Sequence, residues 1–267
     1  MAWLKLIRWK NLAIILLTQF LVWWCVILPE VPLVLTPVNF LLLALSTALI
    51  AAAGYIINDY FDIKIDLINR PERVVLEKVI PRKQAIISHT VLNIAALLCA
   101  GYVAAYAHSY EWLLVQVVCT LLLWFYSTDF KRQYITGNVA VALLAALTII
   151  VLLVYEPVLH HTLNTLPVWV WGIYAYFAFM LTWMREIVKD MEDFIGDESE
   201  GCVTMPIKRG LNFAARYTLV LSLLVVIPLL IAAIVLYQNS YIILSVYVLV
   251  LLVLPLLAWA LFLKRDF

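Results

Sequence analysis

The stretch FLLLALSTALIAAAGYIINDYFDIKID, residues 40–66, combines two features that seldom occur together. Residues 40–57 carry no charged side chain, and three carboxylates then follow closely, at Asp59, Asp62 and Asp66. An uncharged apolar run of ~17–25 residues is long enough to cross a bilayer as a helix. Carboxylates are costly to desolvate near a membrane, and they commonly mark functional sites there. The stretch therefore predicts a membrane helix that ends in a functional acidic cluster.

The whole chain has the composition of a polytopic membrane protein. Of its 267 residues, 66% are hydrophobic and 13% are charged, whereas soluble domains average about 45–50% apolar residues. Eight apolar runs are long enough to span a membrane. They cover residues 11–29, 37–57, 85–107, 111–127, 138–155, 167–185, 213–237 and 240–263. We predict an all-α transmembrane helical bundle of eight spans that forms a single domain, residues 1–267.

The basic residues indicate how this bundle crosses the membrane. They fall into five groups, at residues 5–10, 64–83, 131–132, 185–216 and 264–265. With eight spans, all five groups lie on one side, and the loops on the other side contain no Lys or Arg. Loops rich in Lys and Arg face the cytoplasm. The pattern predicts a multi-pass plasma-membrane protein whose termini and acidic motifs are cytoplasmic. The lipid bilayer is the expected large partner, and no nucleic acid is expected.

A second acidic segment repeats the spacing of the first. In REIVKDMEDFIGDESEG, residues 185–201, the carboxylates Asp190, Asp193 and Asp197 stand at i, i+3 and i+7. These positions share one face of a helix, so each segment should project a strip of three carboxylates. Six like charges around one cavity would repel each other unless divalent cations lie between them. The two strips therefore predict a metal site.

Magnesium is the metal that this chemistry favours. It takes oxygen ligands, commonly one or two carboxylates together with substrate phosphates and water. The predicted ligands are Asn58, Asp59, Asp62, Asp66, Asp190, Asp193 and Asp197. Basic residues that could hold phosphate surround them, namely Arg70, Arg73, Lys131, Arg185 and Lys189. The alternative is two ordinary cytoplasmic loops with solvated charges, but the matched spacing at two helix ends favours a metal-diphosphate site.

Three motifs in this order resemble the UbiA superfamily of intramembrane prenyltransferases. They are NDYFDIKID (58–66), YSTDFKRQYITGN (126–138) and DMEDFIGD (190–197). The resemblance implies a helical barrel around a central cavity with a cytoplasmic cap. It also implies Mg²⁺-dependent transfer of a prenyl group from a polyprenyl diphosphate. The predicted catalytic residues are Asp62, Asp66, Asp193 and Lys131. The predicted substrate-binding residues are Arg70, Arg73, Tyr126, Lys131, Arg185 and Lys189.

The wider phrases NDYFDIKIDLINRPER and REIVKDMEDFIGDESEGCVTMPIKRG are similar to one branch of this family. That branch comprises the geranylgeranylglycerol-phosphate geranylgeranyltransferases and their bacterial relatives. It implies transfer of a geranylgeranyl group to a lipid acceptor, geranylgeranylglyceryl phosphate. The segment RVVLEKVIPRKQ (73–84) departs from the Arg-Pro-x-Pro-Ser-Gly pattern of many relatives. An aromatic acceptor, such as a quinone or chlorin precursor, therefore remains the alternative.

Two other protein classes agree less well with the sequence. Secondary transporters place ionisable groups near the bilayer midplane, whereas each Asp here lies at an expected helix end or in a loop. A scaffolding membrane protein would not need two matched acidic strips. The family typically has nine transmembrane helices, so eight spans predict a gap in the helix ring that faces lipid or a partner subunit.

Overall fold

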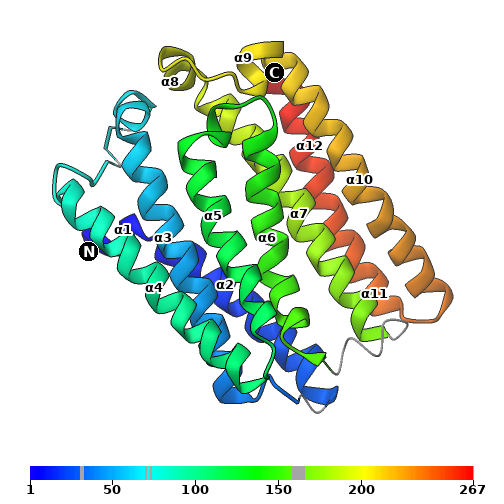
Figure 1. Cartoon of the computed structure of the whole chain (residues 1–267). Helices are drawn as coiled ribbons and strands as arrows, with labels where there is room; N and C mark the ends of the chain where they lie inside the picture. The colour runs from blue at the N-terminus through cyan, green and yellow to red at the C-terminus, as the bar shows by residue number, and fades with distance from the viewer. Residues whose placement is uncertain (31–32, 70, 73, 158–165, 267) are drawn as a thin grey trace.

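The described part of the chain is almost entirely helical. The computed structural model describes residues 1–30, 33–69, 71–72, 74–157 and 166–266 (Figure 1). No strand is present among these residues, and their one isolated bridge joins Leu76 and Ile80. Seven of their helices are long and apolar enough to cross a membrane. They are Trp9–Ile27, Pro37–Asn69, Arg82–Tyr106, Tyr110–Thr128, Thr136–Val154, Leu211–Gln238 and Ile242–Ala260. The chain is a polytopic helical membrane protein.

Seven of the eight predicted spans coincide with these helices. The remaining run, 167–185, lies within α7 (Leu166–Glu192), whose 27 residues would extend ~40 Å at 1.5 Å each. Its second half carries Arg185, Lys189 and Asp190 among other charges, which reduces its apolar character. The count of eight spans stays a prediction.

Helix α3 (Pro37–Asn69) is the central element and the most deeply buried candidate span in the described structure. Small residues such as Ala48 and Ala53 are buried along it, so α4 (Arg82–Tyr106) and α5 (Leu114–Thr128) pack closely against it. The apolar run ends at residue 57, but the helix continues to Asn69. The first acidic motif therefore projects from a rigid helix.

The other helices comprise further spans and the short helices that connect or extend them. At the N-terminal side these are α1 (Ala2–Leu6), α2 (Trp9–Val22), the wide turn η1 (Trp23–Ile27), η2 (Leu28–Glu30), η3 (Tyr110–Leu113), η4 (Phe130–Arg132) and α6 (Thr136–Val154). At the C-terminal side they are α8 (Phe194–Ser199), α9 (Met205–Arg209), α10 (Leu211–Gln238), α11 (Ile242–Tyr247), η6 (Val248–Val253) and α12 (Leu254–Asp266).

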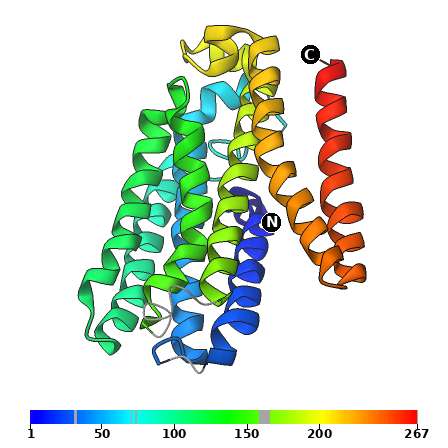
Figure 2. The same cartoon turned by 90° about the vertical axis from the view of Figure 1, so that its right-hand side faces the viewer.

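The two largest of the four apolar clusters in the described structure join the main elements of the bundle. One joins α2, α3, α4 and α6 at the end far from the acidic motif, where Trp23 stacks on Phe40 with ring centroids 4.6 Å apart. The other joins α7 to α10 and includes Met184 and Val225. Helix α12 packs on α10 and η6, so the last hairpin forms one edge of the molecule (Figure 2). Helix α7 thus links the α2–α6 body to the C-terminal hairpin.

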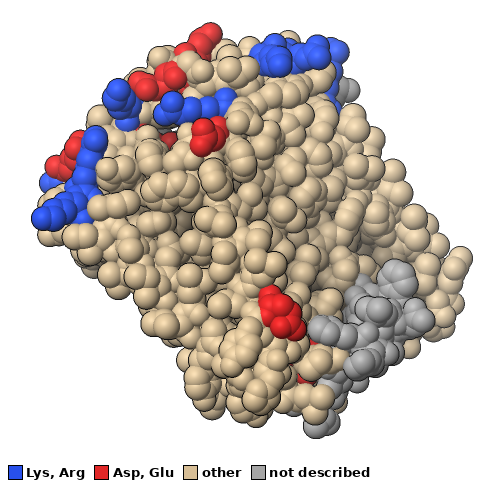
Figure 3. All heavy atoms as spheres, in the orientation of Figure 1, with Lys and Arg blue, Asp and Glu red and all other residues tan. Residues whose placement is uncertain are grey.

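The basic side chains gather at one end of the bundle. Figure 3 shows Lys and Arg from the region of α9 across to the start of α4, and none at the opposite end of the face in view, where acidic side chains are seen. The exposed sides of the spans instead present large apolar residues such as Leu98, Val220 and Ile231. This is the surface expected of helices in contact with lipid.

Candidate active site

A charged cavity of about 1010 Å³ lies at the acidic end of α3. Its walls come from the N-terminal segment, α3, the turn after α5, α7 and α12. The acidic lining residues are Asp59, Asp62, Asp66, Glu72, Glu192 and Asp193, and the basic ones are Lys5, Arg8, Lys10, Lys131, Arg185 and Lys189. Acidic and basic groups in equal number around one space suit a ligand that brings both metal and phosphate.

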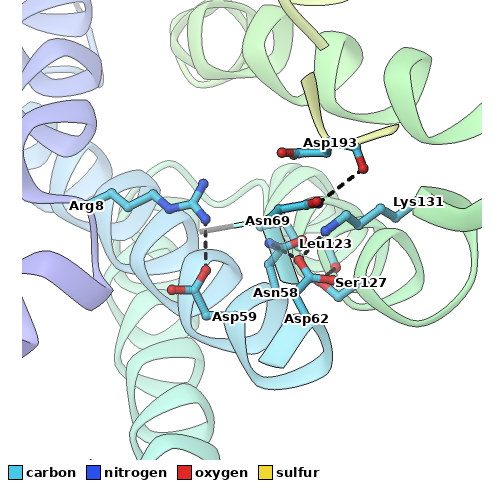
Figure 4. Close-up of polar contacts among 9 residues, drawn as sticks. All are labelled: Arg8, Asn58, Asp59, Asp62, Asn69, Leu123, Ser127, Lys131 and Asp193. Carbon is cyan, nitrogen blue, oxygen red and sulfur yellow. Dashed lines mark hydrogen bonds and ion pairs between the residues drawn. The ribbon is translucent and has the colours of Figure 1, made fainter. Parts of the chain in front are cut away.

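Two carboxylates of the first strip pair with cations (Figure 4). Asp59 Oδ1 accepts a hydrogen bond of 2.8 Å from Arg8 Nη2 within an ion pair. Asp62 Oδ2 forms an ion pair with Lys131 and accepts a hydrogen bond of 2.7 Å from Asn58 Nδ2. Because α3 is continuous here, these side chains leave the same helix face and reach the same cavity.

Asn58 presents an oxygen that suits a cation. Its Oδ1 atom is buried and has no hydrogen-bond partner among the described residues, while its Nδ2 is used by Asp62. A buried acceptor without a partner is costly, so such an atom usually serves a specific role. An amide oxygen beside a carboxylate is a normal ligand pair for a hard divalent cation.

The second strip does not lie on one helix, so that prediction is wrong. Helix α7 ends at Glu192, and Asp193 separates it from α8 with φ −90° and ψ 7°. The interruption changes the direction of the chain before Asp197. Of this strip, only Asp193 lines the cavity in the described structure, whereas Asp190 and Asp197 do not. The expectation of six carboxylates around one cavity is therefore reduced to four.

Asp197 is buried beside the cavity, and Asp190 is half-buried there. Asp190 Oδ2 accepts a hydrogen bond of 2.8 Å from Asn138 Nδ2, which joins α7 to the start of α6. Asp197 belongs to α8, and burial raises the pKa of its carboxyl group to about 6 although Lys131 opposes this shift. Both residues can influence the charge of the site without contacting a ligand in the cavity.

Asn69 joins the two acidic segments, and sequence reasoning missed it. Its Nδ2 donates to the carbonyl oxygen of Asp193 at 3.1 Å, and its Oδ1 accepts from the backbone N–H of Gly196 at 3.0 Å. A Cβ at position 196 would lie 2.4–2.6 Å from the Asn69 side chain, so glycine is required for this approach. We call this pair of hydrogen bonds the Asn69 clasp. It attaches the end of α3 to the break between α7 and α8.

The predicted basic residues divide into two groups. Lys131, Arg185 and Lys189 line the cavity as expected. Burial disfavours the charge of Lys131, but the adjacent Asp62 more than offsets this and raises the pKa of the lysine. Arg70 and Arg73 lie outside the described residues.

Tyr126 and the N-terminal basic residues differ from expectation. Tyr126 is buried and does not line the charged cavity. Lys5, Arg8 and Lys10 do line it, although their positions in the sequence indicated only membrane topology. The motif spacing carried no signal for them because they come from a different helix.

A second, apolar cavity of about 420 Å³ adjoins the charged one. Residues of α2, α3, α5 and α6 form most of its wall, including Ile14, Ile50 and Leu144. Asn11 and Arg185 line both cavities, so the two spaces meet at these side chains. The arrangement offers a charged compartment for a polar group beside an apolar compartment for a hydrocarbon.

The residues present fit Mg²⁺. In the described structure no three His, Cys, Asp or Glu side chains are grouped closely enough to hold a metal on their own. Magnesium does not need such a group, because one or two carboxylates usually bind it together with substrate phosphates and water. Asp62 and the unpaired oxygen of Asn58 supply that kind of partial ligand set.

Fold and site together define a membrane-embedded helical protein with a polar cavity at one end and an apolar cavity beside it. The family model for the UbiA prenyltransferase family matches residues 12–266. The chain belongs to the UbiA prenyltransferase family.

Several similar relatives bear one name. The digeranylgeranylglyceryl phosphate synthase of Methanosphaera stadtmanae is 32% identical over 189 residues, 70% of this chain and 64% of that protein. The synthase of Methanothermobacter thermautotrophicus is 34% identical over 175 residues, 64% of this chain and 57% of that protein. The synthase of Pyrococcus abyssi is 36% identical over 176 residues, 66% of this chain and 58% of that protein. The matches thus span less than two thirds of each relative.

Two solved structures share the fold. One is described as a UbiA homolog from Archaeoglobus fulgidus bound to GPP and Mg²⁺, with TM-score 0.62, 18% identity, and coverage of 100% of this chain and 88% of that one. The other is described as concerning digeranylgeranylglyceryl phosphate synthase in membranes, with TM-score 0.57, 24% identity, and coverage of 99% and 92%. At these identities the similarity establishes the fold.

Proposed function

We propose that this protein transfers a prenyl group from a polyprenyl diphosphate to a membrane lipid acceptor in a Mg²⁺-dependent reaction. The observation that carries the proposal is the junction of the charged and apolar cavities at Asn11 and Arg185. A prenyl diphosphate has the same two parts, an anionic head and a hydrocarbon tail. Family membership and the named relatives support the same chemistry.

In this proposal the charged cavity holds the diphosphate. Lys131, Arg185 and Lys189, which line this cavity, would bind its oxygens, and the oxygens of Asn58, Asp59, Asp62, Asp66 and Asp193 would hold Mg²⁺. Bound Mg²⁺ supplies Lewis-acid stabilisation of negative charge on the departing diphosphate. The ammonium group of Lys131, fixed by Asp62, contributes to the same stabilisation. Asp190 and Asp197, which do not line the charged cavity, influence its electrostatic potential through their charges.

The apolar cavity holds the prenyl tail and excludes water. Its wall is built mostly from apolar side chains, so the allylic cation formed on ionisation would be shielded from hydrolysis. The hydroxyl oxygen of the acceptor then forms a bond to C1 of this cation, whose C–O bond to diphosphate has already broken. Pyrophosphate leaves, and the hydroxyl proton is lost to the aqueous side of the charged cavity.

The substrates we propose are geranylgeranyl diphosphate and geranylgeranylglyceryl phosphate. The basis is the name shared by the similar relatives, which are digeranylgeranylglyceryl phosphate synthases. We further propose that residues 1–267 act as one domain in the plasma membrane. The charged cavity, α8, α9 and both termini would then face the cytoplasm, in keeping with the one-sided Lys and Arg distribution.

A transfer assay tests the reaction directly. Purified protein in detergent receives labelled geranylgeranyl diphosphate, geranylgeranylglyceryl phosphate and Mg²⁺, and the product is identified by mass. We expect an ether-linked product and pyrophosphate, both abolished by EDTA and restored by Mg²⁺. A parallel reaction offers a hydroxybenzoate acceptor. Product from that acceptor alone would assign the enzyme to aromatic prenylation.

Protease accessibility tests the proposed orientation. Tags placed at either terminus should be cleaved by protease only in inside-out vesicles. Cleavage of the C-terminal tag from the outer face of intact cells would contradict both the orientation and the even number of spans.

A further inference from the structure

Arg8 occupies an unusual backbone position at the edge of the charged cavity. It lies between α1 and α2 with φ 50° and ψ 54°, in the left-handed region. Residues other than glycine seldom adopt this backbone conformation, and strained positions of this kind cluster at functional sites. The turn is held by hydrogen bonds from Arg8 N to the oxygen of Lys5, 3.0 Å, and from Asn11 N to the oxygen of Arg8, 2.8 Å. It breaks the N-terminal helix beside the cavity.

The Arg8 side chain reaches into the cavity but keeps donors available. Its guanidinium lies over the Tyr55 ring, 4.9 Å from the centroid, and one nitrogen bonds Asp59. A guanidinium has five N–H donors. About a third of the side chain, 34%, is exposed, so a ligand in the cavity can reach it. The Asp59 pair and the Tyr55 ring fix its direction.

Lys5 and Lys10 line the same wall of the cavity. Together with Arg8 they form a cationic group that comes from the N-terminal segment, whereas Lys131, Arg185 and Lys189 come from the η4 turn and α7. We call Lys5, Arg8 and Lys10 the N-terminal basic wall. The cavity thus presents cations on two separate sides, more than one diphosphate headgroup requires.

Apolar side chains adjoin the N-terminal basic wall. Leu4 and Trp9 line the cavity from the N-terminal segment, and both are about half exposed, at 51%. Leu256 and Trp259 line it from α12, the helix at the edge of the bundle. Tryptophan and leucine at the charged end of a membrane bundle suit the interfacial region, where lipid headgroups and chains meet.

We propose that the N-terminal basic wall is a second anion subsite, which binds the phosphate of an amphiphilic lipid acceptor while its chains lie against Leu4, Trp9 and Trp259. The proposal rests on the proposed function and deepens it. A phosphate monoester carries about −1.5 to −2 charges and three acceptor oxygens, so several cations can bind it at once. A single carboxylate, as on an aromatic acid, is matched by one arginine fork.

A substrate and variant comparison tests the subsite. Two acceptors are used, geranylgeranylglyceryl phosphate and the same molecule without phosphate, geranylgeranylglycerol. Wild type, Arg8→Gln and Lys5→Gln are compared with Arg209→Gln, which removes an exposed arginine outside both cavities. Because a hydrogen bond to a charged group contributes ~1.5–3 kcal/mol, kcat/KM for the phosphate acceptor should fall about ten- to hundredfold in Arg8→Gln. The value for the alcohol acceptor and the KM for the donor should stay near wild type.

The possible outcomes distinguish failure of the subsite proposal from failure of the prenyl-transfer proposal. Equal losses with both acceptors, or a raised donor KM alone, would overturn the subsite while leaving prenyl transfer intact. Absence of product from either lipid acceptor in wild type would overturn the proposed function and the subsite together. If Arg8→Gln does not fold, as judged by gel filtration, Arg8→Lys and Lys5→Gln decide the question through the same acceptor ratio.

Inorganic phosphate distinguishes a lipid headgroup from a free anion. We expect inorganic phosphate to compete with the phosphate acceptor only at concentrations far above the acceptor KM, because inorganic phosphate has no hydrocarbon chain to contact Leu4, Trp9 and Trp259. Competition at concentrations equal to the acceptor KM would show that the wall binds free phosphate and would overturn the lipid assignment.

Discussion

The two acidic strips have the same spacing and different structures. The first lies on one uninterrupted helix, α3, and two of its carboxylates pair with the cations Arg8 and Lys131. The second is divided between the end of α7, the turn at Asp193 and α8. There Asn138 donates to Asp190, and Asn69 bonds the backbone of Asp193 and Gly196.

This difference indicates that the two acidic segments have different roles. Charges paired across the cavity can be redistributed when metal and substrates bind, because Lys131 is a candidate ligand of the diphosphate and Arg8 a candidate ligand of the acceptor phosphate. Amide contacts to buried groups instead position the chain and change little in charge. We infer that α3 carries most of the ligand chemistry, and that the second segment brings Asp193 to it at a defined distance.

The largest expected effect comes from removing a carboxylate that faces the cavity. Asp62→Asn and Asp193→Asn should each reduce turnover by about two to four decades, since loss of a metal ligand costs several kcal/mol of transition-state stabilisation. Pyrophosphate release from folded protein measures this. Asp129→Asn, an exposed carboxylate outside the cavity, serves as the control. Near-wild-type turnover in folded Asp62→Asn would contradict the proposed metal site.

The next effect concerns the cation that pairs with Asp62. Lys131→Ala should lower kcat/KM for the diphosphate donor by about ten- to hundredfold, because a charged hydrogen-bond donor to the diphosphate is lost. Steady-state kinetics with varied donor show the change, and Lys83→Ala, an exposed lysine, should have none. Unchanged donor kinetics would return Lys131 to the residues that only set topology.

A smaller effect should follow from opening the Asn69 clasp. Asn69→Ala removes two hydrogen bonds of about 1 kcal/mol each, so the Mg²⁺ concentration for half-maximal activity should rise by up to about thirtyfold. Gly196→Ala should act in the same direction, because its Cβ displaces the Asn69 side chain. Recovery of turnover at high Mg²⁺ would indicate positioning rather than catalysis. Asn239→Ala, at the exposed end of α10, is the matched control.

The smallest effect is expected behind the cavity wall. Asn138→Ala leaves the Asp190 carboxyl group without its amide donor, which should cost about 1–3 kcal/mol of stability. Thermal unfolding in detergent measures this loss, and turnover at low temperature should fall only a few-fold. A loss of turnover as large as that of Asp193→Asn would place Asp190 among the direct ligands and remove the contrast between the strips.

The spans and the first acidic motif could be predicted because their signals are local. Seven predicted runs coincide with candidate membrane helices, since the length of an apolar run directly reflects bilayer thickness. Asp59, Asp62 and Asp66 line the cavity as the i, i+3, i+7 rule requires. The same rule failed for the second strip because it assumes an unbroken helix, whereas the helix is interrupted at Asp193.

By itself, the sequence determined the membrane class, the family resemblance, the acidic motifs and the one-sided placement of Lys and Arg. Each of these features depends on residues that are close together in the chain. Only the tertiary structure brought Arg8 to Asp59, Lys131 to Asp62 and Asn69 to Gly196, pairs separated by 51, 69 and 127 positions. The physical reason is that ion pairs and hydrogen bonds act over a few ångströms in space. Which distant residues come within that range is decided by how the helices pack.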